Sequence, residues 1–207
     1  MGTVQNVIFD LGGVLLDWNP GGILERCYAD TLSRDAMRDA LFRHEDWLAF
    51  NRGDFSEPDL LSRLQKRTGR SLPELTRVLD TVRDSLVVKP ETVAVLRSLS
   101  ERVVPLYCLS DMPVSVFAHV RERYDFWHAF RGIVISGEVR MMKPGRAVFG
   151  YLLTQYELSA EATDFVDDHP PNIEGAKAAG MQTILFRNAE QCARDLETLI
   201  DISISLA

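Results

Sequence analysis

Residues 4–17 read VQNVIFDLGGVLLD and combine an apolar run, an acid and a pair of glycines. The run at 7–9 has the β-branched and aromatic bias of a buried strand. Asp10 follows it, and Gly12 and Gly13 then permit a tight turn. Open α/β sheets bind their ligands at the carboxyl ends of strands, which is where we expect this acid. Taken alone, the stretch is equally consistent with a buried strand that ends in an ordinary Asp-Gly type turn.

The bulk composition is that of an ordinary globular protein. The chain has 207 residues, 46% hydrophobic and 26% charged, which suits one large domain or a core with a smaller insert. A formal net charge of -7 argues against a nucleic-acid partner. No apolar run reaches the ~18 residues of a membrane span and no secretory signal is evident, so we expect a cytoplasmic protein without a membrane partner. Cys27, Cys108 and Cys192 lack metal-binding spacing and are expected to be free thiols.

The order of the predicted elements indicates an α/β fold with an insertion. Strands alternate with helices after residue 89, which predicts a Rossmann-like parallel sheet covered on both faces. A strand-helix-strand unit takes ~30 residues or slightly more, yet the second predicted strand begins only near Val103. The surplus has the pattern of a helical bundle, so we predict a core at 1–17 and 89–207 with a cap domain at 18–88 over the end of the sheet. The core strands are expected at 7–9, 103–109, 132–136, 163–166 and 182–186.

Polar groups recur at the ends of the predicted strands. Asp10, Ser110, Lys143 and the pair formed by Asp167 and Asp168 each lie just past a strand or on the loop after it. Parallel strands present their C-terminal ends together, so these groups should converge. Three carboxylates cannot all ionise at close range without compensation, and Lys143 supplies a single positive charge. A divalent ion would balance the remainder, and carboxylate oxygens with waters suit Mg²⁺. Ser110 and Lys143 would then hold an anion such as phosphate, which leaves one carboxylate as a nucleophile.

Each of these features also has a purely structural interpretation. Ser110 is consistent with a helix N-cap, Lys143 with an exposed turn, and the acid pair with the N-terminus of a helix. For any one feature the structural interpretation is at least as good. Their occurrence together, in this order and on this architecture, favours a functional site.

Four segments carry a resemblance to a known family. They are FDLGGVL at 9–15, LYCLSD at 106–111, MMKP at 141–144 and FVDDHPPNIEGAKAAGM at 165–181. In this order they resemble the motifs of the haloacid dehalogenase superfamily, and the helical insert resembles its first cap type. Within that superfamily the chain is most similar to phosphatases related to alpha-D-glucose-1-phosphate phosphatase and to the N-terminal phosphatase domain of soluble epoxide hydrolase.

The resemblance implies a Mg²⁺-dependent phosphatase that acts on a small phosphorylated metabolite. Asp10 would be the nucleophile that forms an aspartyl-phosphate and would also bind Mg²⁺, while Gly12 would lend its carbonyl to the metal. Asp168 would be a metal ligand, with Asp167 in the inner or second coordination shell. Ser110 would hold the phosphoryl group, and Lys143 would stabilise both the nucleophile and the phosphate. The residues expected at the phosphate or substrate are Leu11, Gly12, Trp18, Trp47, Ser110, Asp111 and Lys143.

Two positions depart from the family's pattern. Many phosphatases of the superfamily carry a second Asp two residues after the nucleophile as general acid and base, and here that position is Gly12. General acid-base help is typically worth ~10²–10⁴ in rate, so we expect weak activity or a good leaving group, such as an anomeric sugar phosphate. Asp17, Asp111 or a cap residue would have to substitute. Asp111 itself replaces the usual Asn and would repel a phosphate unless it is protonated or turned away.

Two other functions stay open. A 2-haloacid dehalogenase, in which the aspartate attacks carbon without a metal, agrees with Gly12 but leaves the clustered carboxylates without a purpose. A weakly active or non-catalytic binding protein agrees with the missing acid. We expect a monomer or a homodimer. The cap should select the substrate through Trp18, Trp47 and charged neighbours, unless the two tryptophans only pack and the charged side chains face solvent. Those neighbours are Arg43, His44 and Arg52.

Overall fold

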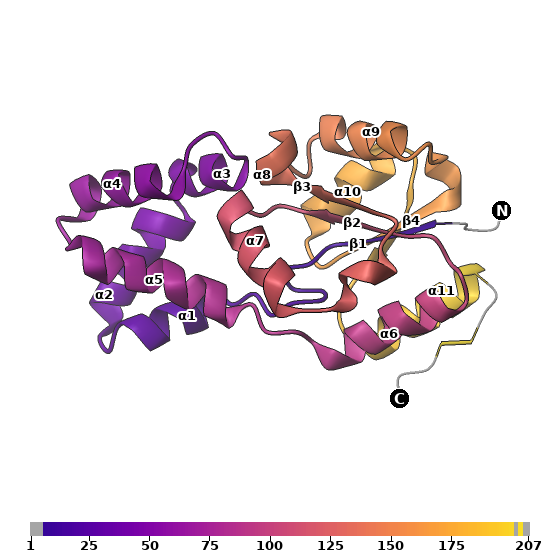
Figure 1. Ribbon diagram of the computed structural model, residues 1–207, viewed down its shortest axis with the longest axis horizontal. Helices are drawn as coiled ribbons and strands as arrows, with labels where there is room; N and C mark the ends of the chain where they lie inside the picture. Colours follow the sequence, from indigo (N-terminus) through magenta and orange to yellow (C-terminus); the bar gives the residue numbers. More distant parts are fainter. Residues whose placement is uncertain (1–5, 201–202, 205–207) are drawn as a thin grey trace.

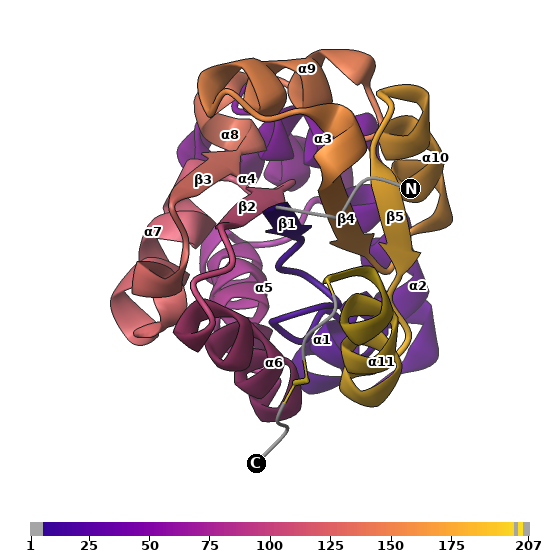
Figure 2. The ribbon, with the colours of Figure 1, turned by 90° about the vertical axis from the view of Figure 1, so that its right-hand side faces the viewer.

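The computed structural model describes residues 6–200 and 203–204. Its centre is a parallel sheet of five strands, counted among these residues, in the order β3-β2-β1-β4-β5. The strands are β1 (Asn6–Phe9), β2 (Leu106–Ser110), β3 (Gly132–Ile135), β4 (Thr163–Asp167) and β5 (Gln182–Leu185). Figure 2 shows them side by side with β1 between β2 and β4. The predicted α/β fold with a Rossmann-like sheet is therefore confirmed.

Helices cover both faces of the sheet. They are α6 (Pro90–Glu101), α7 (Val114–Arg123), α8 (Ser136–Val139), α9 (Arg146–Gln155), α10 (Pro170–Ala178) and α11 (Ala189–Ile200), with 3₁₀ turns at Phe126–Ala129 and Ala160–Ala162. In β1, Val7 and Phe9 point into one hydrophobic cluster, which α6, α7 and α11 complete. Ile8 points the other way, into a cluster completed by α9 and α10 (Figure 2). Burial on both faces explains the apolar runs at the centres of β1 and β2.

A separate helical segment lies between β1 and β2 in the chain. It comprises α1 (Pro20–Cys27), α2 (Thr31–Met37), a π-helical turn (Arg38–Phe42), α3 (Glu45–Asn51), α4 (Glu57–Thr68) and α5 (Leu72–Ser85). We call residues 20–85 the helical cap. Its helices share a hydrophobic cluster of their own that includes Leu24, Met37, Leu60 and Val78. Figure 1 shows the helical cap to one side of the sheet, beyond the ends of the strands.

Two short connections join the helical cap to the sheet, and they run beside each other. Leu16 and Val88 form an antiparallel bridge. Asp17 N donates to Val87 O at 2.8 Å, and Lys89 N donates to Leu15 O at 2.9 Å. The helical cap therefore enters and leaves the core at one place.

The structure corrects the start of the second strand. The sequence predicts a strand from Val103, whereas β2 begins at Leu106. Val103 has a φ of 60°, in the left-handed region that β-branched residues avoid in strands. Pro105, next to the strand, has no N–H to donate to a ladder.

The three cysteines are free, as expected. None of the helices in the described residues combines the length and apolarity that a membrane crossing needs.

One buried carboxylate is not explained by packing. Asp164 of β4 is 0% exposed, and neither carboxyl oxygen has a hydrogen-bond partner among the described residues. Burial and, to a lesser extent, the nearby Asp195 of α11 together raise its pKa to about 7. An acid whose pKa is higher in the folded state favours folding while protonated and opposes it once ionised, so its penalty grows between about pH 4 and pH 7 and is complete above.

We therefore expect Asp164→Asn to raise the free energy of unfolding at pH 8 by roughly 1–3 kcal/mol and to have little effect near pH 4. Urea unfolding at both pH values measures this difference. Asp84→Asn, at an exposed position of α5, is the matched control. Equal destabilisation of Asp164→Asn at both pH values would show that the carboxyl group has a partner that the amide cannot replace.

Candidate active site

The predicted polar groups meet at the carboxyl ends of the central strands. β1 and β4 are neighbours, and the strand order runs away from them in opposite directions. Such a reversal opens a crevice at the strand ends, which is the usual ligand site of open α/β sheets. Asp10 follows β1, and Asp167 and Asp168 lie at the end of β4. One ligand atom from each of these three carboxylates lies within 4.8 Å of the others.

Lys143 joins the two strand ends. Its Nζ lies 2.9 Å from Asp10 Oδ1 and 2.7 Å from Asp167 Oδ2, and it donates to Leu109 O at 3.3 Å. Burial alone would lower the pKa of Lys143, but the carboxylates of Asp10, Asp167 and Asp111 raise it above its usual range. Lys143 therefore stays protonated and holds one positive charge in the site.

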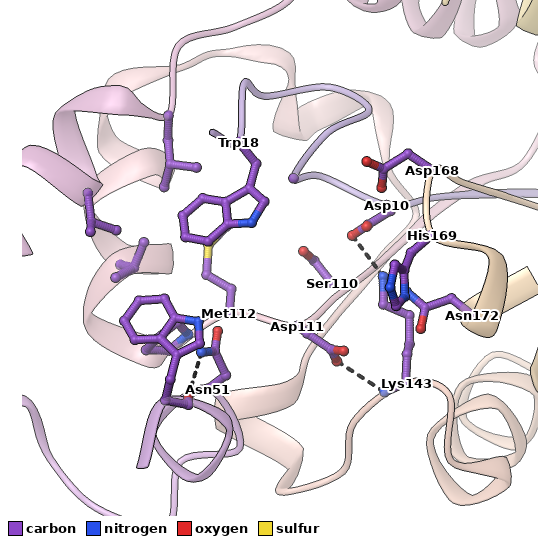
Figure 3. A pocket seen from close by; sticks show the side chains of 16 residues that line it. Asp10, Trp18, Asn51, Ser110, Asp111, Met112, Lys143, Asp168, His169 and Asn172 are labelled. Atoms are coloured by element: carbon purple, nitrogen blue, oxygen red, sulfur yellow. Dashed lines mark hydrogen bonds and ion pairs between the residues drawn. The ribbon is translucent and has the colours of Figure 1, made fainter. Parts of the chain in front are cut away.

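Asp167 and Asp168 have different surroundings. Asp167 is 0% exposed and its two oxygens accept bonds from Lys143 Nζ, from His169 N at 2.8 Å, and from Asn172 Nδ2 at 3.0 and 3.1 Å. Asp168 is exposed and lines the cavity (Figure 3). An oxygen that already accepts strong bonds is a poorer metal ligand than a free one. The arrangement therefore suits Asp168 as a direct ligand and Asp167 as the group that orients Lys143.

Asp10 presents two unequal oxygens. Its Oδ1 accepts the N–H of Leu11 at 2.7 Å and faces Lys143. Burial raises the pKa of Asp10 above its ordinary value, Lys143 lowers it and Asp167 raises it further. A divalent cation beside this group would favour its ionised form, which is the form that can act as a nucleophile.

Ser110 and Asp111 behave differently although they are adjacent. Ser110, the last residue of β2, is 2% exposed and lines the cavity. Asp111 turns part of its carboxylate away, because its Oδ1 accepts the backbone N–H of Lys143 at 3.2 Å (Figure 3). Burial raises the pKa of Asp111, against the effect of Lys143. Turning away and a raised pKa are the two conditions under which an acid at this position tolerates a phosphate.

The glycine pair after Asp10 has two distinct environments. Gly13 has a φ of 81°, and a Cβ there would stand 2.1 Å from Asp168 Oδ2. A Cβ on Gly12 would meet nothing closer than Trp18 Cβ at 3.7 Å. Gly13 therefore makes room for the Asp168 carboxylate, whereas Gly12 is free of steric demand.

These groups line a cavity of about 230 Å³ between the sheet and the helical cap. Of the predicted substrate residues, Trp18 and Trp47 line it, whereas Leu11 does not: its side chain is fully buried and its N–H donates to Asp10 Oδ1. Asp17, offered as a substitute acid, lies in a neighbouring cavity instead.

The charged residues predicted to face the substrate do not line this cavity. Arg43 pairs with Asp39, Arg52 pairs with Asp54, and His44 Nδ1 accepts the N–H of Asp46 to cap α3.

Sequence reasoning missed several lining residues. Asn172, on the first turn of α10, lies five residues after Asp167 and donates to it. It belongs to the segment that carries the family resemblance, and that was the one available signal. Asn51 and Met112 had no signal in the sequence, because their positions depend on how the helical cap packs against the core.

Comparisons with known proteins agree with this geometry. A sequence profile described as haloacid dehalogenase-like hydrolase matches residues 4–180. The sesquiterpene phosphatase astK of Aspergillus oryzae is 28% identical over 198 residues, which cover 96% of this chain and 97% of that protein. Bifunctional epoxide hydrolase 2 of Mus musculus is 28% identical over 87 residues, 42% of this chain and 15% of that protein. The HAD family enzyme bt-2542 of Bacteroides thetaiotaomicron, solved with magnesium and inorganic phosphate, superposes with a TM-score of 0.71 at 19% identity over 89% of this chain and 94% of that one.

Asp111→Asn should strengthen phosphate binding, because the amide oxygen can still accept the Lys143 N–H while the negative charge is lost. At pH 8 we expect the inhibition constant of inorganic phosphate, measured on the hydrolytic activity, to be ~3–10-fold lower for this variant than for the unmodified protein. The advantage should shrink at pH 5, where the raised pKa keeps more of Asp111 protonated. The inhibition constant of phosphate at both pH values measures this, with the exposed Asp17→Asn as control. Weaker phosphate inhibition of Asp111→Asn would contradict the assignment.

Proposed function

Because the chain belongs to the haloacid dehalogenase-like hydrolases, we propose that it is a magnesium-dependent phosphatase of small phosphorylated metabolites. The family predicted from the sequence is thereby confirmed. The relative named as a phosphatase, which matches nearly the full length of both chains, supports hydrolysis of a phosphoric monoester. The proposal rests on the carboxylate cluster formed by Asp10, Asp167 and Asp168, for which Lys143 is the one paired cation in the part of the chain that the structure describes.

The donor set fits magnesium. It offers carboxylate oxygens of Asp10 and Asp168, and the backbone carbonyl that the family resemblance assigns to Gly12. Hard oxygen donors with room for water are what Mg²⁺ requires, and the net negative charge of the cluster favours a divalent cation. When bound, magnesium supplies positive charge beside the phosphoryl oxygens. A related fold solved with magnesium and phosphate supports the same choice.

The protein's own residues account for two successive displacements. A carboxylate oxygen of Asp10 attacks phosphorus, the bond from phosphorus to the ester oxygen breaks, and the leaving alkoxide takes up a proton to become the alcohol. Water then attacks the phosphorus of the aspartyl-phosphate, releases one proton and restores the Asp10 carboxylate. Lys143 and Ser110 hold the phosphoryl oxygens throughout, through a positive charge and a hydroxyl hydrogen bond.

Gly12 supplies no proton to the leaving alkoxide. General acid catalysis is typically worth ~10²–10⁴ in rate, so esters of weakly acidic alcohols should turn over slowly. Substrates with good leaving groups escape this loss because their alkoxide or carboxylate needs no proton in the transition state.

The test is hydrolysis of acetyl phosphate, which has a good leaving group and little organic substituent. We expect turnover with Mg²⁺, none with a chelator, and a loss of at least ~10³-fold in Asp10→Asn, which lacks the nucleophile. Phosphate release measures the rate. Chloride release from 2-chloropropionate without metal would instead identify a dehalogenase. Magnesium-independent turnover, or turnover unaffected by Asp10→Asn, would contradict the proposal.

Gly13→Ala should weaken magnesium binding because its Cβ would displace the Asp168 carboxylate. We expect the Mg²⁺ concentration for half-maximal activity to rise by at least ~10-fold, in line with the usual cost of disturbing groups around a metal. Gly12→Ala, which adds the same methyl group where it meets only Trp18 Cβ at 3.7 Å, is the matched control. An equal Mg²⁺ requirement in both variants would remove Asp168 from the metal site.

We also propose that residues 18–88 act as a cap domain on a core formed by 1–17 and 89–207. The absence of nucleic-acid and membrane partners, the monomer or homodimer and the cytoplasmic location stay predictions from the sequence.

A further inference from the structure

The cavity above the carboxylates has two chemically distinct halves. Figure 3 shows Asp10, Asp168 and Lys143 on one side and Trp18 and Met112 on the other. The second half is formed by apolar side chains from both parts of the molecule. The helical cap and its first connection supply Trp18, Trp47 and Val82; the second connection and the core supply Leu86, Met112 and Val116. We call these six residues the apolar wall.

The helical cap offers the cavity little hydrogen-bonding capacity. Among the described residues that line the cavity, the helical cap supplies two hydrogen-bonding side chains, the amide of Asn51 and the indole N–H of Trp47. Asn51 Nδ2 donates to Trp47 O at 2.7 Å, within its own helix, and the Asn51 backbone carbonyl accepts from Ser136 Oγ at 2.6 Å. Asn51 thereby fastens α3 to the core, and the bond to Trp47 O occupies one of the two side-chain N–H groups that Asn51 could offer to an organic group in the cavity.

The apolar wall is also held rigidly. The rings of Trp18 and Trp47 stack with centroids 6.1 Å apart and an interplanar angle of 6°. Phe42 packs edge-on against both rings, at 5.8 and 5.1 Å. Trp18 is nevertheless 36% exposed, so one edge of this aromatic stack faces the approach to the cavity.

We propose that the substrate is a phosphate monoester whose alcohol portion is apolar and short, a conclusion that rests on the proposed phosphatase function. A sugar in this position would leave most of its hydroxyl groups without partners, and unpaired buried polar groups are costly. An alkyl or alkenyl group would instead bury its surface against the apolar wall. The cavity of about 230 Å³ is smaller than the ~300–1,000 Å³ of typical ligand pockets, so the group is short. The sugar phosphate expected from the sequence stays the competing prediction.

Two phosphates with the same type of leaving group test the proposal. n-Hexyl phosphate and glucose 6-phosphate both release a primary alcohol of six carbons, so their leaving groups are of the same type, while the alcohol portions differ in polarity and in shape, a linear chain against a ring. With Mg²⁺ we expect kcat/KM for hexyl phosphate to exceed that for glucose 6-phosphate by at least ~100-fold, since each buried methylene contributes a few-fold. Acetyl phosphate is too small to contact the apolar wall, so its hydrolysis rate reports on the phosphoryl-transfer step alone.

The outcomes separate the two proposals. No magnesium-dependent hydrolysis of acetyl phosphate would refute the phosphatase and the inference with it. Hydrolysis of acetyl phosphate with equal or better use of glucose 6-phosphate than of hexyl phosphate would overturn the inference alone.

Variants of the wall provide an independent test. Val116→Thr keeps the shape of the side chain and adds a hydroxyl group to the wall, and Trp18→Ala removes a part-exposed ring at little risk to folding. Each should lower the ratio of kcat/KM for hexyl phosphate to that for acetyl phosphate by ~5–10-fold or more. Val114→Thr makes the same change at an exposed position two residues earlier on α7 and should leave the ratio unchanged. A ratio unaffected by both wall variants would mean that the alcohol portion binds elsewhere.

Discussion

A single buried ammonium group holds the site together. Lys143 Nζ lies within 3 Å of carboxylate oxygens on two different strand ends, and it is the one cation that they share among the described residues. Removing one partner of such a buried arrangement typically costs ~3–5 kcal/mol, because the remaining charges lose their compensation. The network extends outward through Asp167, whose other bonds come from the backbone of His169 and the amide of Asn172. The carboxylate of Asp10, which we propose as the nucleophile, is therefore held in place by charge compensation without a substrate.

The core sheet and the helical cap supply different kinds of groups to the cavity. The sheet places Asp10, Ser110 and Asp168 at strand ends, where backbone hydrogen bonds fix their positions, and in the proposed reaction these groups bind the phosphoryl part of the substrate. The helical cap contributes aromatic and aliphatic surface and fastens Asn51 to the core. Because Gly12 offers no acid to a leaving group, the proposed reaction would depend more heavily on binding and on the substrate's own reactivity than it would in a site with that acid.

The parts that the sequence could predict are those that depend on local pattern. Apolar runs locate β1 and β4, and parallel pairing brings Asp10 and Asp167 together once their strands are recognised. The predicted start of β2 was wrong because an apolar pattern does not reveal the left-handed backbone conformation of Val103. Trp18 and Trp47 were predicted at the substrate, but Met112 and the three aliphatic residues of the apolar wall could not be, because they meet only after helices distant in the chain have packed together. The lone carboxylate of Asp164 was invisible for the same reason.

The paired connections between core and helical cap have a consequence for how such a protein can change. Leu16 and Val88 lie side by side, so the chain leaves the sheet and returns to it at nearly the same point. A segment whose two ends are adjacent can be lengthened, shortened or exchanged without shifting the strands, because no strain reaches the sheet. Relatives with the same core carboxylates, and hence the same proposed chemistry, could then differ in substrate preference through exchange of the helical cap alone.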